Sequence, residues 1–228
     1  MKKNLTDEFI EKLEYRILMG EYKVGQRLPT LRELATTNGV SRSVVNAAII
    51  ELANIGYIKI VPTKWIEVAD WEREGSLAIL NGIVEFDLMD KKIIGSLLDS
   101  RKLIEIECVK LASLKAKKQD ILKLQAIVNE ENIYISIEDR VCIDMKFHHM
   151  ISVMSGNFVY PLIMKSFEKN SYKLIHEFYS KDNIYEFVMK THKEILEAIS
   201  SGDVDTACNS MLNLLIHGEK ILFEKIGG

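Results

Sequence analysis

The character of the sequence changes at Asp70. Before it, two short runs rich in β-branched and aromatic residues, 57–61 and 65–69, flank Pro62-Thr63-Lys64 and predict a β-hairpin. After it, no further pair of strand-like runs occurs, and amphipathic stretches with helical spacing follow one another. The chain of 228 residues is long enough for two domains. The sequence therefore predicts an α-dominated, two-domain protein, with an α/β module over residues 1–70 and an all-α antiparallel helical bundle over residues 71–228.

Three helices are predicted ahead of the hairpin, and a glycine ends each of them. The first covers residues 7–19. The second begins after Thr30, which has the capping-box spacing to Glu33, and the third begins after Ser41 as its N-cap. The short connection between the second and third helices has the spacing of a helix-turn-helix. The hairpin that follows makes this module a winged helix-turn-helix.

The bundle is predicted to contain successive helical stretches with breaks at Gly156-Asn157, Lys181-Asp182 and Gly202-Asp203. Helices joined by such short breaks pack against one another as antiparallel neighbours. The stretches are 76–86, 91–117, 119–129, 138–154, 158–179, 185–200 and 204–223.

Composition excludes several other classes of protein. The hydrophobic fraction of 47% rules out wholesale disorder, and no apolar run is long enough for a membrane span. The N-terminal residues lack the apolar core of a signal peptide. Cys108, Cys142 and Cys208 are far apart in helical stretches, so we expect buried free thiols in a reducing compartment and neither disulfides nor a zinc finger. A cytoplasmic protein without a membrane partner is the expectation.

The start of the third helix has the chemistry of a DNA-reading element. Between Lys23 and Asn46 there are four basic residues and one acidic residue, although the net charge of the whole chain is −3. The first turn of a helix presents amide groups and a positive dipole end to phosphate. Arg42 can reach base edges or phosphates beside the hydroxyls of Ser41 and Ser43. On spacing alone, a capped surface helix in an unrelated α+β domain is an equal alternative.

This N-terminal module resembles the GntR family of bacterial transcription regulators. The residues that follow the family signature in order and spacing are Gly20, Val24-Gly25, 28–35, 39–42, Ala47, Leu52 and Gly56. The resemblance implies a homodimeric regulator that binds double-stranded operator DNA. Carried over by position, the residues that contact DNA are Arg32, Ser41, Arg42 and Ser43.

Two departures from the family pattern concern the DNA-contacting surface. Asn46 stands where the family usually has arginine, and asparagine can read adenine without adding charge. The wing tip is Pro62-Thr63-Lys64, where many members have a glycine, although Lys64 can meet a phosphate. We therefore expect an operator that differs from the commonest family site.

In the bundle, three residues have the chemistry of a metal site. Asp144 and His148 share a helix face at i, i+4, and His192 on a later helix can complete a carboxylate–imidazole set suited to zinc, nickel or manganese. Two ligands on one face need at least one more. The alternative is an acid–imidazole hydrogen-bonded pair in a metal-free pocket, and both interpretations stay open.

The bundle also resembles the FCD effector domain of the FadR subfamily. The matching residues are 101–105, Ala112, 144–148, 155–157, 192–199, Gly202-Asp203, Ala207 and Met211. In metal-binding members, an aspartate and three histidines face the bundle interior. The third histidine falls on Leu214 here, and His217 lies one turn further on as a displaced candidate ligand.

Arg101 is the candidate for binding an anionic effector, because a guanidinium group can donate two parallel hydrogen bonds to a carboxylate. Position alone equally allows an internal salt bridge from Arg101 to Glu105 or Asp144, and the resemblance favours ligand contact. The expected effector-binding set is Arg101, Glu105, Asn157 and Tyr172, although aromatics at helical spacing are often plain core.

These features together predict a ligand-responsive transcriptional regulator, a repressor whose bundle binds a small carboxylate metabolite with one divalent transition metal. One alternative is a metal-free regulator that responds to acyl-CoA, because the segment 71–80 resembles the fatty-acid-responsive branch of the subfamily. A second alternative is a helical metalloenzyme that uses Asp144, His148 and His192. It lacks an evident nucleophile or general base and leaves the N-terminal module unexplained, so we expect no enzyme.

Overall fold

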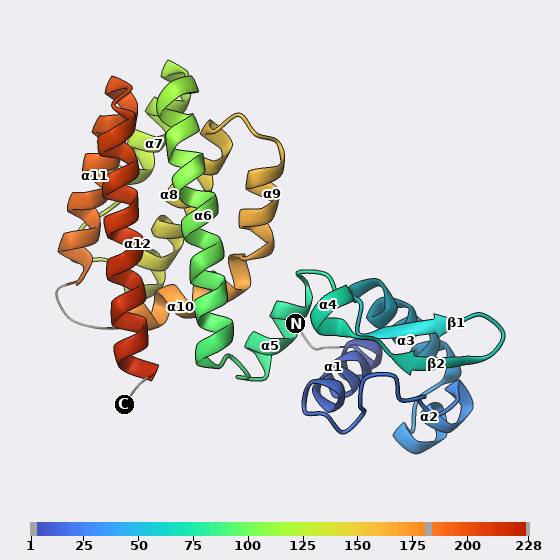
Figure 1. Ribbon diagram of the computed structural model, residues 1–228. Helices are drawn as coiled ribbons and strands as arrows, with labels where there is room; N and C mark the ends of the chain where they lie inside the picture. The colour runs from blue at the N-terminus through green and yellow to red at the C-terminus, as the bar shows by residue number, and fades with distance from the viewer. Residues whose placement is uncertain (1–3, 181–183, 227–228) are drawn as a thin grey trace. The chain divides into compact units, whose positions relative to one another are not determined.

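The computed structural model describes residues 4–180 and 184–226, which fold as two compact units divided after Leu88 (Figure 1). The predicted architecture of an α/β module followed by a helical bundle is confirmed. The break predicted at Lys181-Asp182 lies outside the described residues.

The N-terminal unit has three helices and a two-stranded antiparallel sheet ahead of two short helices (Figure 1). Ile58 pairs with Val68 and Val61 with Trp65, so the strands form the predicted hairpin. The elements are α1 (Leu5–Leu18), α2 (Leu31–Asn38), α3 (Arg42–Ile55), β1 (Ile58–Val61), β2 (Trp65–Val68), α4 (Trp71–Glu74) and α5 (Ile79–Glu85).

Local capping fixes the turn between α2 and α3. Thr30 and Glu33 form the predicted capping box at the start of α2. Gly39 ends α2 with φ of 65°, in the left-handed region that favours glycine. Ser41 then caps α3, because its hydroxyl accepts a hydrogen bond from the Val44 amide at 3.3 Å. The buried face of α3, which includes Leu52, packs against α1 and α2.

Helices α4 and α5 belong to the N-terminal unit, so the units meet after Leu88 and not at the predicted residue 70. The buried Tyr57 explains this, because its hydroxyl donates to the Ile79 carbonyl at 3.3 Å. A Cβ on Gly82 would lie 2.4 Å from the same hydroxyl oxygen, so α5 approaches Tyr57 closely. Local sequence patterns could not reveal this contact, because the hairpin ends well before α5.

The helical unit is built around α8, which packs against α6, α7, α9 and α10, while α12 packs against α6 and α11 (Figure 1). The stretch predicted as one helix over 158–179 is two helices that meet at Phe167. The elements are α6 (Lys91–Lys115), α7 (Lys118–Asn129), α8 (Ile137–Met154), α9 (Val159–Ser166), α10 (Glu168–Tyr179), α11 (Ile184–Ser201) and α12 (Val204–Ile226).

The cysteines are free, as expected, but only Cys108 is fully buried; Cys142 on α8 is exposed. Among the described residues, no helix has the length and apolarity needed to cross a membrane.

The bundle core contains a group of buried ionisable side chains, Glu105, Asp144, His148 and His192. Burying such groups is costly unless they bind one another or an ion, so they mark a candidate site.

Candidate functional site

The six predicted DNA-contacting residues are all exposed: Arg32, Ser41, Arg42, Ser43, Asn46 and Lys64. Arg42 is the first residue of α3, and the Ser41 and Ser43 hydroxyls lie 2.7 Å apart beside it. The arrangement presents hydroxyls, a guanidinium and the helix N-terminus on one side of the unit, which suits phosphate and base edges. Contact of these residues with DNA stays a prediction.

The wing tip adopts a conformation that normally requires glycine. Lys64 N donates to Val61 O at 3.1 Å, which closes a turn with Pro62 and Thr63 at its centre. Thr63 has φ of 61°. A positive φ at the third position of such a turn favours glycine or asparagine, so this threonine is strained. Beside the hairpin, the Arg27 guanidinium lies over the Trp65 ring, 3.7 Å from its centre.

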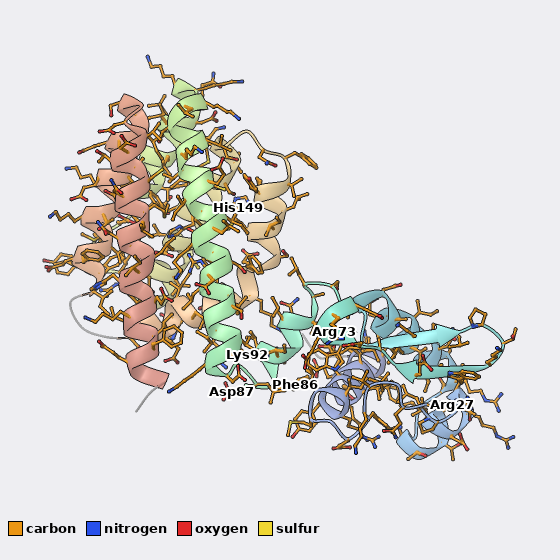
Figure 2. The ribbon with its side chains drawn as sticks, viewed as in Figure 1. Arg27, Arg73, Phe86, Asp87, Lys92 and His149 are labelled. Carbon is orange, nitrogen blue, oxygen red and sulfur yellow. The ribbon has the colours of Figure 1, made fainter. Side chains whose placement is uncertain are left out.

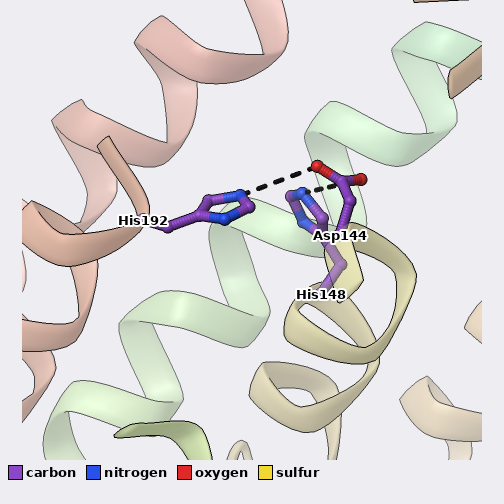
Figure 3. A group of neighbouring side chains, drawn as sticks. All are labelled: Asp144, His148 and His192. Atoms are coloured by element: carbon purple, nitrogen blue, oxygen red, sulfur yellow. Dashed lines mark ion pairs between the residues drawn. The ribbon is translucent and has the colours of Figure 1, made fainter. Parts of the chain in front are cut away.

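In the helical unit, Asp144 and His148 on α8 meet His192 on α11 (Figure 3). The Asp144 carboxylate lies 3.8 Å from His148 Nε2 and 3.7 Å from His192 Nε2. One ligand atom from each residue lies within 4.8 Å of the others. The predicted carboxylate–imidazole set is therefore brought together, with the two Nε2 atoms turned towards one carboxylate.

A second carboxylate lies behind each imidazole. His192 Nδ1 is 2.5 Å from Glu131 Oε1, and His148 Nδ1 contacts Glu105. A histidine that donates Nδ1–H to a carboxylate keeps its Nε2 lone pair for a metal. Sequence reasoning missed Glu131, which follows α7 and lies 61 residues from His192.

The electrostatics of the group favour positive charge. Burial opposes ionisation of Glu105, but Arg101 and His148 outweigh it and lower the pKa of this carboxyl to about 2. Burial also works against a charged His148, yet Glu105 and Asp144 raise its pKa. Three buried carboxylates thus surround two imidazoles, and Arg101 forms an ion pair with one of them. A divalent cation at the imidazoles would balance the excess negative charge.

The residues fit a metal ion. His192 is fully buried, and its Nε2 atom has no hydrogen-bond partner within the described residues. At 3.7 Å from Asp144 the contact is too long for a hydrogen bond. The Tyr179 hydroxyl donates to the same carboxylate oxygen at 2.7 Å. Burial, and after it the negative charge of Asp144, raises the pKa of Tyr179 well above its ordinary value. Tyr179 therefore remains a donor that orients Asp144.

The predicted ligand His217 does not join this group. Its ring packs against Phe187 on α11, with the ring centres 4.4 Å apart. Leu214, at the position where the sequence pattern places a third histidine, is buried in a lining shared with Asp144 and His148. A shift of three residues keeps a side chain near the same face of a helix but moves it about one turn along the axis, and there the His217 ring turns to Phe187. The structure therefore does not bring the displaced histidine to the Asp144 group.

An open cavity of about 790 Å³ lies beside His148 of the Asp144 group, between α6, α8, α9 and α10. His148 lines it together with His149, which Figure 2 labels on α8. Its other charged and polar lining residues are Arg101, Lys146, Lys165, Glu168, Lys169, Ser171 and Tyr172. This excess of cationic side chains suits an anionic ligand. The three lysines were not anticipated from the sequence, because each lies on an ordinary polar helix face.

Two family models match the chain in succession. The model for bacterial regulatory proteins of the gntR family matches residues 5–68, and the FCD domain model matches residues 96–217. The chain belongs to the GntR family. It is a DNA-binding transcriptional regulator with an FCD domain.

Relatives named as transcriptional regulators align with nearly the whole length of this chain. The Exu regulon transcriptional regulator of Escherichia coli is 28% identical, over 98% of this chain and 86% of that protein. The Uxu operon regulator of Haemophilus influenzae is 25% identical, over 93% of this chain and 79% of its own. A solved structure titled "Lar controls the expression of the Listeria monocytogenes agr system and mediates virulence" shares the fold, with a TM-score of 0.70 at 18% identity over 98% of this chain and 99% of that one.

These family members are transcriptional regulators and not enzymes, so the metalloenzyme alternative is wrong. GntR regulators bind operator DNA, often as dimers, and respond to small-molecule effectors. The Asp144 set is therefore a candidate ligand-sensing site in the FCD domain, and no general base is required of it.

The predicted effector-binding residues separate in this GntR regulator. Arg101 and Tyr172 line the cavity, and Arg101 also forms the internal salt bridge to Glu105, with Nε 2.6 Å from Oε1. Glu105 is buried behind His148 and is absent from the cavity lining. Asn157 does not reach the cavity, because its side chain accepts the Val159 amide at 2.8 Å and orders the turn before α9. The structure therefore does not bring the predicted effector residue Asn157 to this cavity.

Proposed function

We propose that this GntR regulator senses a small carboxylate metabolite through a divalent transition metal held by Asp144, His148 and His192. A homodimer places two α3 helices in successive major grooves of a pseudo-palindromic operator. The effector favours one arrangement of the helical unit and so changes the affinity of the protein for DNA. The expected sign is repression that the effector relieves.

The observation that carries the metal proposal is the state of His192. Its Nδ1 atom is held by Glu131, while its buried Nε2 atom faces Asp144 with no hydrogen bond. A neutral imidazole with a free lone pair next to a carboxylate is an unfavourable arrangement until a cation lies between them. Zinc, nickel and manganese all accept such a carboxylate–imidazole set.

The charge of the cavity supports a carboxylate effector. Arg101 reaches the cavity wall while its Nε is held by Glu105, which leaves the remaining guanidinium nitrogens for a carboxylate. Lys146 and Lys165 add positive charge to the lining, although Glu130 and Glu168 partly neutralise them. A cationic effector would be repelled by this surface.

The metal is tested by counting ions in protein that has been stripped and then reloaded with zinc, nickel or manganese. We expect about one ion per chain in the wild type, and loss of it in His192→Ala. His217→Ala is the matched control, because the His217 ring packs on Phe187 and lies outside the Asp144 group. This variant should keep its metal ion. A wild-type protein that binds none of the three metals overturns the metal part of the proposal.

The regulatory response is tested by gel shift with DNA from upstream of the gene, at physiological salt. Specific retardation is expected, and a panel of small carboxylates added to metal-loaded protein should release the DNA. Release by acyl-CoA from metal-free protein would instead support the alternative sensor. Tighter binding with a carboxylate would reverse the expected sign of regulation.

A further inference from the structure

We propose that Glu105 and Glu131 are positioning residues, each of which fixes one imidazole of the metal site. The inference rests on the proposed metal function. It assigns to two buried glutamates, neither of them a metal ligand, the task of choosing which nitrogen each histidine presents.

Two contacts together determine the orientation of the His192 ring. The ring stacks on Phe147, with the ring centres 3.8 Å apart and the planes 19° apart. Stacking fixes the plane of the imidazole but is nearly indifferent to a 180° flip, which exchanges the nitrogens with carbons. The contact with Glu131 at 2.5 Å removes that freedom, because only one flip state places Nδ1 against the carboxylate.

Glu131 is suited to this task by its burial. Its side chain is 3% exposed, although its neighbours Glu130 and Asn132 lie at the surface. Burying a carboxylate without a compensating contact is costly, so its inward position needs an explanation. Holding His192 supplies one, since the Nδ1–H group is the donor that this carboxylate meets.

His148 also meets a buried carboxylate, through a close ion pair with a glutamate of another helix. Its ring lies edge-on to the same Phe147, with the planes at 90°, and its Nδ1 contacts Glu105 on α6. In each imidazole, Nδ1 therefore meets a glutamate, and Nε2 turns to Asp144 (Figure 3). Such outer carboxylates fix the tautomer and raise the basicity of the ligand nitrogen.

The two glutamates differ in what else they bind. Glu105 also forms the ion pair with Arg101, which lines the effector cavity, whereas Glu131 is absent from the lining of that cavity. Glu105 thus joins the cavity wall to a metal ligand, and Glu131 serves the metal site alone.

The experiment measures the affinity of stripped, full-length protein for zinc by competition with a chromophoric chelator, and records the visible spectrum of the cobalt-loaded protein. We expect Glu131→Gln and Glu105→Gln to weaken zinc affinity by about 10- to 100-fold and to change the cobalt bands. The matched controls are Glu130→Gln and Glu107→Gln, exposed neighbours that pair with Lys146 and Lys110. They should leave both readouts unchanged.

The outcomes separate this inference from the proposed function. Wild-type protein that binds no metal overturns both, whereas wild-type affinity and an unaltered cobalt spectrum in Glu131→Gln overturn the positioning role alone. Should Glu105→Gln fail to fold, Glu131→Gln decides, because Glu131 has no ion pair with Lys or Arg among the described residues. Thermal unfolding of the metal-free variants separates a folding defect from a loss of positioning.

Discussion

The two units hold their candidate functional residues in opposite ways. On the N-terminal unit, Arg42 and Asn46 project from α3 into solvent. In the helical unit, Asp144 and His192 are buried and contact other polar side chains. Exposed contact residues can be changed with little effect on stability, whereas buried ones support the fold and the site together. Function and stability should therefore be separable in the first unit and coupled in the second.

The largest expected effect tests that coupling at Phe147, which is fully buried between the two imidazoles. Phe147→Ala should destabilise the helical unit by about 3–5 kcal/mol because it removes a large core side chain. It should also weaken metal binding, since His192 loses its stacking partner. Phe158→Ala is the control, because Phe158 is 83% exposed and its removal should change stability by less than about 0.5 kcal/mol. Chemical denaturation and metal titration measure both effects, and unchanged metal affinity in Phe147→Ala would contradict the coupling.

Metal binding should stabilise one unit and not the other. A ligand that binds only the folded state, present at 100 times its dissociation constant, adds about 2.7 kcal/mol. Scanning calorimetry with zinc, and again after chelation, should shift the unfolding of the helical unit while the N-terminal unit stays in place. His192→Ala should abolish the shift. An equal shift of both transitions would contradict the separation of the two units.

Arg42→Ala tests the other side of the comparison. Loss of a base or phosphate contact should weaken operator binding by about 1–3 kcal/mol, and a phosphate contact would also reduce the salt dependence by about one unit of slope. Metal content and thermal stability should not change, because the Arg42 side chain is exposed. The control is Arg73→Ala on α4, whose side chain is 84% exposed (Figure 2). An equal loss of affinity in both variants would indicate charge alone and not a specific contact.

The sequence predicted what short-range chemistry determines. Thr30 and Ser41 were recognisable as caps because capping depends on residues within one helical turn. Asp144 and His148 were recognisable as neighbours because four residues return to the same helix face. The winged helix-turn-helix and the first two residues of the candidate metal site therefore needed no tertiary information.

The errors arose where packing between distant segments decides. Glu131 lies beyond the end of α7, and only the packing of that segment on α11 brings it to His192. His217 has the right chemistry, but it lies one turn further along α12, where its ring packs on Phe187, and Leu214 has the buried position beside Asp144 and His148. Local spacing could not separate these two possibilities, because the direction of a side chain from a helix depends on how that helix is seated.

The smallest expected effect concerns Thr63, where the family resemblance and the backbone together define a test. The wing tip keeps a positive φ of 61° although a β-branched residue occupies it. Thr63→Gly should relieve about 1–3 kcal/mol of backbone strain, and the greater freedom of glycine in the unfolded chain should take back about 0.4–1 kcal/mol. We therefore expect a net stabilisation of about 1 kcal/mol in the N-terminal unit.

Thr37→Gly is the matched control for that variant, because Thr37 is an exposed threonine inside α2, where glycine is a poor helix former. It should destabilise the same unit. Operator affinity measured beside stability then locates the wing contact: unchanged affinity in Thr63→Gly with weakened affinity in Lys64→Ala assigns the contact to the lysine charge. If Thr63→Gly destabilises the unit, the threonine side chain stabilises the turn by more than its strained backbone costs. Its hydroxyl, which donates to the Pro62 carbonyl at 2.7 Å, would be the group responsible.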